Sequence, residues 1–325
     1  MRIGNDLCGL PPAQSACGIA CGADRIEFVE RRAGGFDVAR ITAALRSDRL
    51  ILARNALQRD AEQVMHDVAA ELGLSVNLEM QATFAGIHGH RQNVGRYYMT
   101  VNRREEFAFI LPHSEGSGFS NIQLASFYCH QNTTDGGVSI LMNTDQDSAA
   151  WKNTRELVTR IDPGSRPLTV TEKAVARTRF WAEESPGPDD VLVEERPSAM
   201  EGVRFLWMLT PLRKSFSTVL QREVYPYWDS VASKDLDSVS ECIRLMRSYD
   251  LLREPAGGRG IDYFDKAYCR AVWHSGVTYR ELFKAVVVRK LERGDLLIQN
   301  NLTWTHAASN WTPGSGTRNV IAAFA

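Results

Sequence analysis

The feature that most constrains the fold of this chain is a series of short apolar segments separated by turn residues. Between residues 96 and 143, the segments RYYMTV, FAFIL, IQLASFYC and VSILMN are aromatic or β-branched, with Gly, Ser, Asn or Asp between them. Such segments predict β-strands, and their close succession predicts an antiparallel sheet. Strand patterns return near the C-terminus, where Gly294-Asp295 leads into LLIQNN and the chain ends in TRNVIAAFA. We therefore expect a mainly β fold.

Helical patterns flank these strands. The segments 36–46 and 61–73 carry apolar residues at helical spacing, and the second ends in a glycine. Between them, LILA at 50–53 predicts a short strand. The stretch 183–191, rich in Pro, Gly and Asp, predicts a surface loop. Farther along we expect one strand and two helices, at 204–210, 235–252 and 279–292 respectively.

Composition excludes several classes of protein. Hydrophobic residues make up 44% of the 325 residues and charged residues 24%, which is ordinary for a globular protein. Because 38 Lys and Arg balance 39 Asp and Glu, no strong positive field is available to attract nucleic acid. The longest apolar runs, such as 285–288, fall far short of the roughly 20 residues of a membrane span. We expect neither nucleic acid nor membrane as a partner.

The six cysteines are sparse, and no secretory signal stands at the N-terminus, so we expect a cytoplasmic protein. Cys17 and Cys21 have the spacing of a possible metal pair. No second pair or matching histidine follows at zinc-finger spacing, however, and ordinary thiols are the simpler interpretation.

A first pair of metal-type side chains follows the apolar strand FAFIL. His113 and Glu115 are two residues apart, and alternate residues of an extended strand project from the same face. Taken alone, the motif is weak, since many such pairs are solvated or cap a turn. His306 follows another predicted strand, 193 residues downstream (306 − 113). Two imidazoles and one carboxylate on one face of an octahedron are the ligands of non-haem Fe(II) oxygenases.

Two further features support a site around these residues. Arg318 lies 12 residues after His306 (318 − 306), which suits a hairpin that returns a guanidinium to the metal on the neighbouring strand. A bidentate arginine matches the distal carboxylate of a diacid. A Gly-Gly turn in TTDGGVSIL precedes Ser139, whose hydroxyl is placed to support the same carboxylate.

With these residues the chain resembles the Fe(II)/2-oxoglutarate dioxygenase superfamily, in its taurine dioxygenase and clavaminate synthase-like branch. The resemblance covers roughly 107–143 and 294–325. It implies a mainly β fold with flanking helices and a double-stranded β-helix (jelly-roll) core. We expect a single domain over 1–325, with this core at about 95–145 and 290–325 and a large insertion at about 146–289.

The resemblance also implies the chemistry. Fe(II) is expected on His113, Glu115 and His306, and 2-oxoglutarate on Arg318 with help from Ser139, where relatives more often have Thr. With O2, such enzymes oxidise a C–H bond by hydroxylation, desaturation or cyclisation. The expected substrate is an amino-acid-like or natural-product small molecule of specialised metabolism, free or bound to a carrier protein.

The chain departs from many relatives in two respects, the residues after His306 and the use of Glu115 where Asp is commoner. Ala307-Ala308 follow His306 where many relatives have Gly-Arg, so a substrate-anchoring arginine is absent at that place and an anionic substrate is less expected. Glu115 is the carboxylate of the clavaminate synthase-like subset and not the Gly or Ala of related halogenases, so halogenation is not expected.

Other residues are weaker candidates. We expect His88 and His90 either to lie in a loop or face the substrate, or to be ordinary surface histidines. Four substrate-binding candidates have a structural alternative such as core packing or solvation: Asn301, Trp304, Arg96 and Tyr98.

Two rival functions share the same ligands. A non-catalytic jelly roll that retains a metal for sensing would produce no succinate. A hydrolytic zinc enzyme would leave Arg318 without a task and lacks an apparent general base.

Overall fold

The computed structural model describes residues 22–87, 91–101, 110–115, 122–153, 155–179, 182–184, 186–198, 200, 202–211 and 283–325. Within these ranges, the side chains of 84–87, 110–113, 150, 153, 155–157, 179 and 183–184 are not described. The predicted helix at 235–252 lies outside the described residues, as do Cys17, Cys21, His88 and His90.

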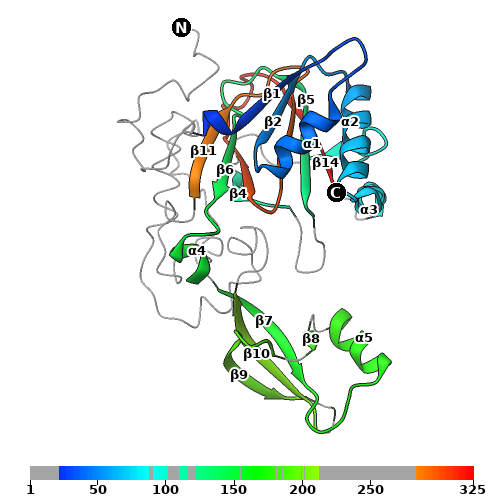
Figure 1. Cartoon of the computed structure of the whole chain (residues 1–325), viewed down its shortest axis with the longest axis vertical. Coiled ribbons are helices and arrows are strands. Elements are labelled where there is room, and N and C mark those ends of the chain that lie inside the picture. The colour runs from blue at the N-terminus through cyan, green and yellow to red at the C-terminus, as the bar shows by residue number, and fades with distance from the viewer. Residues whose placement is uncertain are drawn as a thin grey trace.

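The described chain is mainly β with flanking helices, as the sequence predicts, and its main body contains two sheets (Figure 1). The larger sheet has the order β1-β2-β12-β5-β14-β3. Its strands are β1 (Ile26–Glu30), β2 (Leu50–Arg54), β12 (Leu296–Asn300), β5 (Leu124–Asn132), β14 (Arg318–Phe324) and β3 (Met99–Thr100). Adjacent strands in this sheet are antiparallel, except that β1 and β2 run parallel to each other.

The second sheet has the order β11-β6-β13-β4 and is antiparallel throughout. Its strands are β11 (Phe283–Arg289), β6 (Ser139–Thr144), β13 (Trp304–Ala308) and β4 (Ile110–His113). Buried apolar side chains from both sheets pack together, among them Leu52 of β2, Leu141 of β6, Val287 of β11 and Val320 of β14. The two sheets therefore face each other across a shared core.

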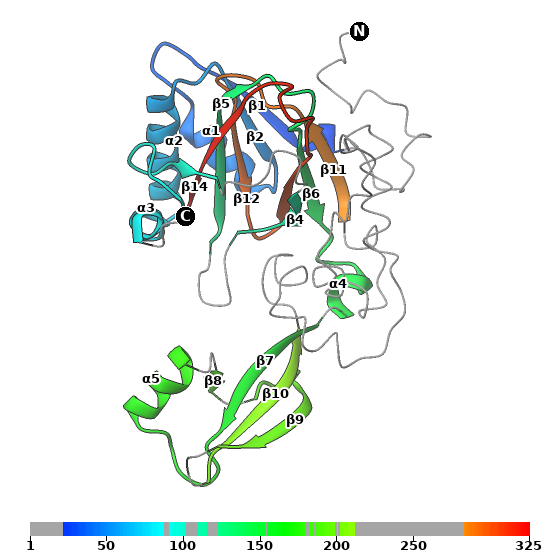
Figure 2. The same cartoon turned by 180° about the vertical axis from the view of Figure 1, so that it is seen from behind.

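Helices cover the outer face of the larger sheet (Figures 1 and 2). They are α1 (Val38–Arg46), α2 (Gln58–Glu71) and α3 (Ser75–Ile87). The apolar stripe of α2, which includes Val64 and Val68, packs in one cluster with Ile51 and Ile298 of the sheet. The helix α2 ends just before Gly73, whose φ of 73° is the left-handed conformation that favours glycine after a helix.

A third sheet, with the order β8-β7-β10-β9, lies apart from the two main sheets in both views (Figures 1 and 2). It consists of β7 (Arg155–Asp162), β8 (Ala182–Glu184), β9 (Val191–Pro197) and β10 (Arg204–Pro211), with α5 (Val170–Arg179) beside β8 and α4 (Ala149–Asn153) leading into β7. These elements fall inside the predicted insertion. No helix in the part of the chain that the structure describes is long and apolar enough to cross a membrane.

Three sequence-based predictions about secondary structure were wrong. The segment predicted as a helix at 279–292 contains strand β11, which pairs with β6 and so belongs to a main sheet although the predicted insertion included it. Its Val-Val-Val run is buried on both faces, which removes the alternation that marks a strand. The segments 122–129 and 138–143 do not share one sheet, because β5 and β6 lie in different sheets. The strand predicted at 96–101 is reduced to β3.

Candidate functional site

Glu115 follows β4 and is fixed through its backbone by Asn301. The Glu115 amide donates to Asn301 Oδ1 (3.0 Å), and Asn301 Nδ2 donates to the carbonyl oxygens of Glu115 and Ile122 (2.8 Å each). Asn301 is fully buried. An amide that is satisfied on both sides by backbone groups holds a loop firmly. Asn301 thus anchors the Glu115 segment, and it does not line the cavity as a substrate-binding residue would.

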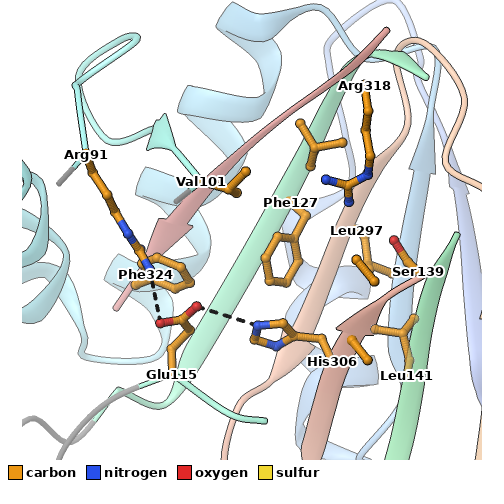
Figure 3. A pocket seen from close by; sticks show the side chains of 13 residues that line it. Arg91, Val101, Glu115, Phe127, Ser139, Leu141, Leu297, His306, Arg318 and Phe324 are labelled. Carbon is orange, nitrogen blue, oxygen red and sulfur yellow. Dashed lines mark hydrogen bonds and ion pairs between the residues drawn. The ribbon is translucent and has the colours of Figure 1, made fainter. Parts of the chain in front are cut away.

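His306 lies in the middle of β13, and its side chain is almost buried. Its Nε2 lies 3.6 Å from Glu115 Oε1 (Figure 3), and its Nδ1 lies 3.2 Å from Gln299 Nε2. The ring of Phe127 packs edge-on against the imidazole, with 4.6 Å between the ring centres. Gln299 and Phe127 therefore fix the orientation of the imidazole, and Nε2 points to the carboxylate.

His113 is placed by strand register. In the pairing of β4 with β13, His113 lies directly opposite His306. Its side chain lies outside the described residues, and among the side chains that are described no group of three metal-type ligands comes together. The backbone thus brings two predicted ligands to adjacent strands, and Glu115 follows two residues after the first.

The chemistry and spacing of these groups fit a metal ion. Two ligand atoms that each lie about 2.1 Å from one ion, at right angles to each other, are about 3 Å apart. The 3.6 Å between Glu115 Oε1 and His306 Nε2 is close to this spacing. A small side-chain movement would bring both atoms onto one ion.

Glu115 and His306 line a cavity of about 200 Å³ between the two main sheets (Figure 3). Most of its wall is apolar. The lining residues are Arg91, Val101, Glu115, Phe127, Ser139, Leu141, Leu297, His306, Ala307, Ala308, Arg318, Val320 and Phe324. A small apolar cavity with few polar groups is typical of a small-molecule site.

Arg318 lines the same cavity as Glu115 and His306, at its other end (Figure 3). Its Nε donates to the carbonyl oxygen of Gly137 (3.3 Å), and its guanidinium lies 6.0 Å from the ring centre of Trp311. Burial lowers the pKa of this guanidinium, because it disfavours the charged form. Among the described residues no carboxylate pairs with Arg318. A shielded guanidinium without a carboxylate partner is suited to bind an external anion.

Ser139 begins β6 and lines the same cavity. The structure places Ser139, Arg318 and the Glu115–His306 pair in the lining of one cavity. The predicted hairpin between the strands of His306 and Arg318 was wrong, however, because β13 and β14 are not neighbours and lie in opposite sheets. Arg318 reaches the cavity from the facing sheet.

Arg91 also lines the cavity, and no sequence motif pointed to it. Its Nη2 lies 3.4 Å from Glu115 Oε2, and its guanidinium lies over the ring of Phe324, 5.2 Å from the ring centre. The expected place for a second arginine, after His306, is occupied by Ala307 and Ala308. The cavity nevertheless has a second guanidinium, from a segment with no recognisable motif.

The other substrate-binding candidates do not line the cavity. Trp304 is fully buried and donates from Nε1 to the carbonyl oxygen of Asp48 (3.2 Å). Tyr98 is also fully buried and shares a 2.6 Å hydrogen bond with Ser126. Arg96 is exposed and pairs with Glu79 (2.7 Å). Arg96 and Tyr98 precede the short strand β3, so the alternation that would place them on one strand face does not apply.

Comparison with known proteins gives similarity to solved structures only. No family model matches the chain, and no curated protein sequence does. PvcB of Pseudomonas aeruginosa is similar over 92% of this chain and 85% of its own, at 12% identity and a TM-score of 0.38. A putative α-ketoglutarate-dependent taurine dioxygenase of Burkholderia xenovorans is similar over 88% and 82%, at 11% identity and a TM-score of 0.35.

A third similar structure is the non-haem iron oxygenase OrfP in complex with Fe, succinate and a dihydroxyarginine. It covers 88% of this chain and 77% of its own, at 12% identity and a TM-score of 0.39. Identities and TM-scores this low do not assign a fold or a function to this chain.

Proposed function

We propose that this chain is an Fe(II)- and 2-oxoglutarate-dependent oxygenase that oxidises a C–H bond of a small molecule. The observation that carries the proposal is that one cavity has a histidine–carboxylate pair at one end and, at the other, an arginine that pairs with no carboxylate among the described residues. The first suits a metal cation and the second suits the distal carboxylate of a diacid.

The metal would be held by His113, Glu115 and His306. Bound iron would supply the oxidising chemistry, in which O2 converts 2-oxoglutarate to succinate and carbon dioxide. The Gln299 side-chain amide contacts the His306 ring at Nδ1, and Nε2 points toward the cavity; metal binding by Nε2 requires the ring proton on Nδ1, to which Gln299 would present its amide oxygen. Asn301 binds the backbone N–H and carbonyl oxygen of Glu115, and this holds the backbone that carries the Glu115 carboxylate in place.

The co-substrate would be oriented by Arg318 and Ser139. The Arg318 fork offers parallel N–H donors to a carboxylate, and the Ser139 hydroxyl offers one more. Between the two ends the wall is formed by apolar side chains such as Phe127, Leu141 and Val320, which exclude water. In such surroundings the hydrogen bonds of Arg318 to an anion are stronger than in solvent.

The two facing sheets would form the double-stranded β-helix core that the sequence resemblance implies. The third sheet and its helices would then be carried by a large insertion, within a single domain. We infer an amino-acid-like or natural-product substrate, free or bound to a carrier protein. The cytoplasm is the compartment that the cysteine pattern suggests.

The test is anaerobic addition of Fe(II) and 2-oxoglutarate to the purified protein. We expect a weak visible charge-transfer band in the wild type and its loss in His113→Ala. His66→Ala is the matched control, because His66 lies half-exposed on α2 and should keep the band. A wild type without the band, or a band that survives in His113→Ala, would refute the proposed function. Succinate released on admission of O2 excludes a non-catalytic metal-binding module.

A further inference from the structure

The two carboxylate oxygens of Glu115 face different neighbours, His306 and Arg91. Oε1 faces His306 Nε2 at 3.6 Å, on the side where the metal ligands meet. Oε2 faces Arg91 Nη2 at 3.4 Å (Figure 3). The carboxylate therefore presents one oxygen to the metal position and the other to a cation that the protein itself supplies.

The guanidinium of Arg91 is held in this position from several sides. It lies over the face of Phe324, which is almost fully buried, and its Nη1 lies 3.7 Å from the sulfur of Met99. The backbone that follows Arg91 is fixed as well: the amide of Gln92 donates to Thr100 Oγ1 (2.9 Å), and that of Thr100 to the Gln92 carbonyl (2.8 Å). A guanidinium stacked on a buried ring loses little freedom when it binds a carboxylate.

We propose that Arg91 is a positioning residue that keeps Glu115 a one-oxygen metal ligand. A carboxylate that binds a metal through both oxygens occupies two coordination positions. Two histidines and one carboxylate oxygen leave three positions of an octahedron open, and a second carboxylate oxygen would take one of them. By engaging Oε2, Arg91 preserves the position that co-substrate or oxygen requires. This inference rests on the proposed function, because it presupposes metal on Glu115.

The charge of Arg91 makes the proposal sharply testable. A guanidinium beside the site repels a divalent cation, so its removal would tighten metal binding if charge alone mattered. Loss of an outer partner that orients a ligand instead weakens metal binding by about 10–100-fold. The sign of the change distinguishes the two effects.

The experiment is titration of the full-length protein with Co(II), followed by visible absorption, in the wild type, Arg91→Gln and Arg91→Lys. We expect the Kd for Co(II) to rise about 10-fold or more in Arg91→Gln. The absorption spectrum should also change in Arg91→Gln, because a second carboxylate oxygen would replace another ligand of Co(II). Arg91→Lys keeps the charge but lacks the planar fork, and an intermediate Kd is expected.

Arg96→Gln is the matched control. Arg96 also pairs with a glutamate and lies over an aromatic ring, with Glu79 at 2.7 Å and the Tyr97 ring centre at 4.9 Å, but it does not line the cavity. Its Kd for Co(II) and its spectrum should match the wild type. Melting temperatures of all variants separate a folding defect from a site defect, and Arg91→Lys keeps the test valid if Arg91→Gln does not fold.

The outcomes separate the two proposals. A wild type that does not bind Co(II) overturns the proposed function and this inference together. A wild type that binds, with Arg91→Gln binding equally or more tightly and an unchanged spectrum, overturns the role of Arg91 alone.

Discussion

The two ends of the cavity each contain an arginine, and the two arginines differ in what they contact. Arg91 lies 3.4 Å from a carboxylate of the same chain, whereas Arg318 has only a backbone carbonyl and an aromatic ring as partners among the described residues. A shielded charge without a counter-charge costs free energy. Arg91 therefore has a counter-charge within the chain, whereas Arg318 has no carboxylate partner among the described residues.

Under the proposed function, this difference would let one small cavity hold a metal cation and a carboxylate ligand at separate ends. At the Glu115 end, the charge of the carboxylate is shared between His306 and Arg91. At the Arg318 end, the charge is positive and no carboxylate pairs with it among the described residues. Apolar side chains of the cavity wall, such as Phe127 and Leu141, lie between the two ends. Substitutions at each end should therefore have separable effects.

The largest effect is expected from His306→Ala, which removes one of the predicted ligands. We expect Fe(II) or Mn(II) affinity to fall by more than the roughly 10–100-fold typical of outer partners, because a direct ligand is lost. Metal-dependent succinate formation should disappear. Isothermal titration with Mn(II) measures the first effect and succinate quantification the second. Retention of wild-type Mn(II) affinity in His306→Ala would show that His306 is not a metal ligand and that the two ends of the cavity do not differ in the way proposed.

Arg318→Met should produce a smaller loss that is confined to the other end. A hydrogen-bonded charge contributes about 1.5–3 kcal/mol, so the KM for 2-oxoglutarate should rise about 10–100-fold. Mn(II) affinity should stay unchanged, because Glu115 and His306 are untouched. The measurement is succinate formation against 2-oxoglutarate concentration.

Arg196→Met is the matched control for Arg318→Met. Arg196 also lies over a tryptophan, with its guanidinium 4.1 Å from the ring centre of Trp207, but it belongs to the third sheet. Arg196→Met should leave the KM for 2-oxoglutarate unchanged. An equal rise in both variants would mean that Arg318 does not bind the co-substrate.

The sequence analysis singled out Glu115, His306, Arg318 and Ser139 but missed Arg91, for a physical reason. Arg318 and Ser139 are each marked by local signals, a strand after a turn and a Gly-Gly turn before a strand. Arg91 has no such signal, because its role depends on the approach of Phe324 and Glu115, which are distant in sequence. Contacts made between non-neighbouring segments are not encoded in local spacing.

The same limit explains the error at β11. The strand is buried on both faces, so its residues are continuously apolar and the period that distinguishes a strand from a helix is lost. The helices α1 and α2 each keep one solvated face, and both were correctly predicted. The spacing of apolar residues distinguishes a helix from a strand only where one face of the element is buried and the other is solvated.

The smallest effect is expected from Gly137→Ala, which probes how the turn before Ser139 supports Arg318. Gly137 has a φ of 64°, and an added Cβ would lie 2.8 Å from Arg318 Cδ and from Thr134 Oγ1. Gly202→Ala is the matched control, since Gly202 has a φ of 72° but open space around a Cβ. The backbone strain should lower the free energy of unfolding by about 1–2 kcal/mol in both variants.

Only Gly137→Ala should also change co-substrate binding, because only there does the new methyl group displace the Arg318 side chain. A displacement that costs about 1 kcal/mol of binding would raise the KM for 2-oxoglutarate about five-fold. Denaturant unfolding and succinate kinetics on the two variants measure the two effects. If both variants show the same KM, the turn does not position Arg318, and the anion end of the cavity depends on the strand β14 alone.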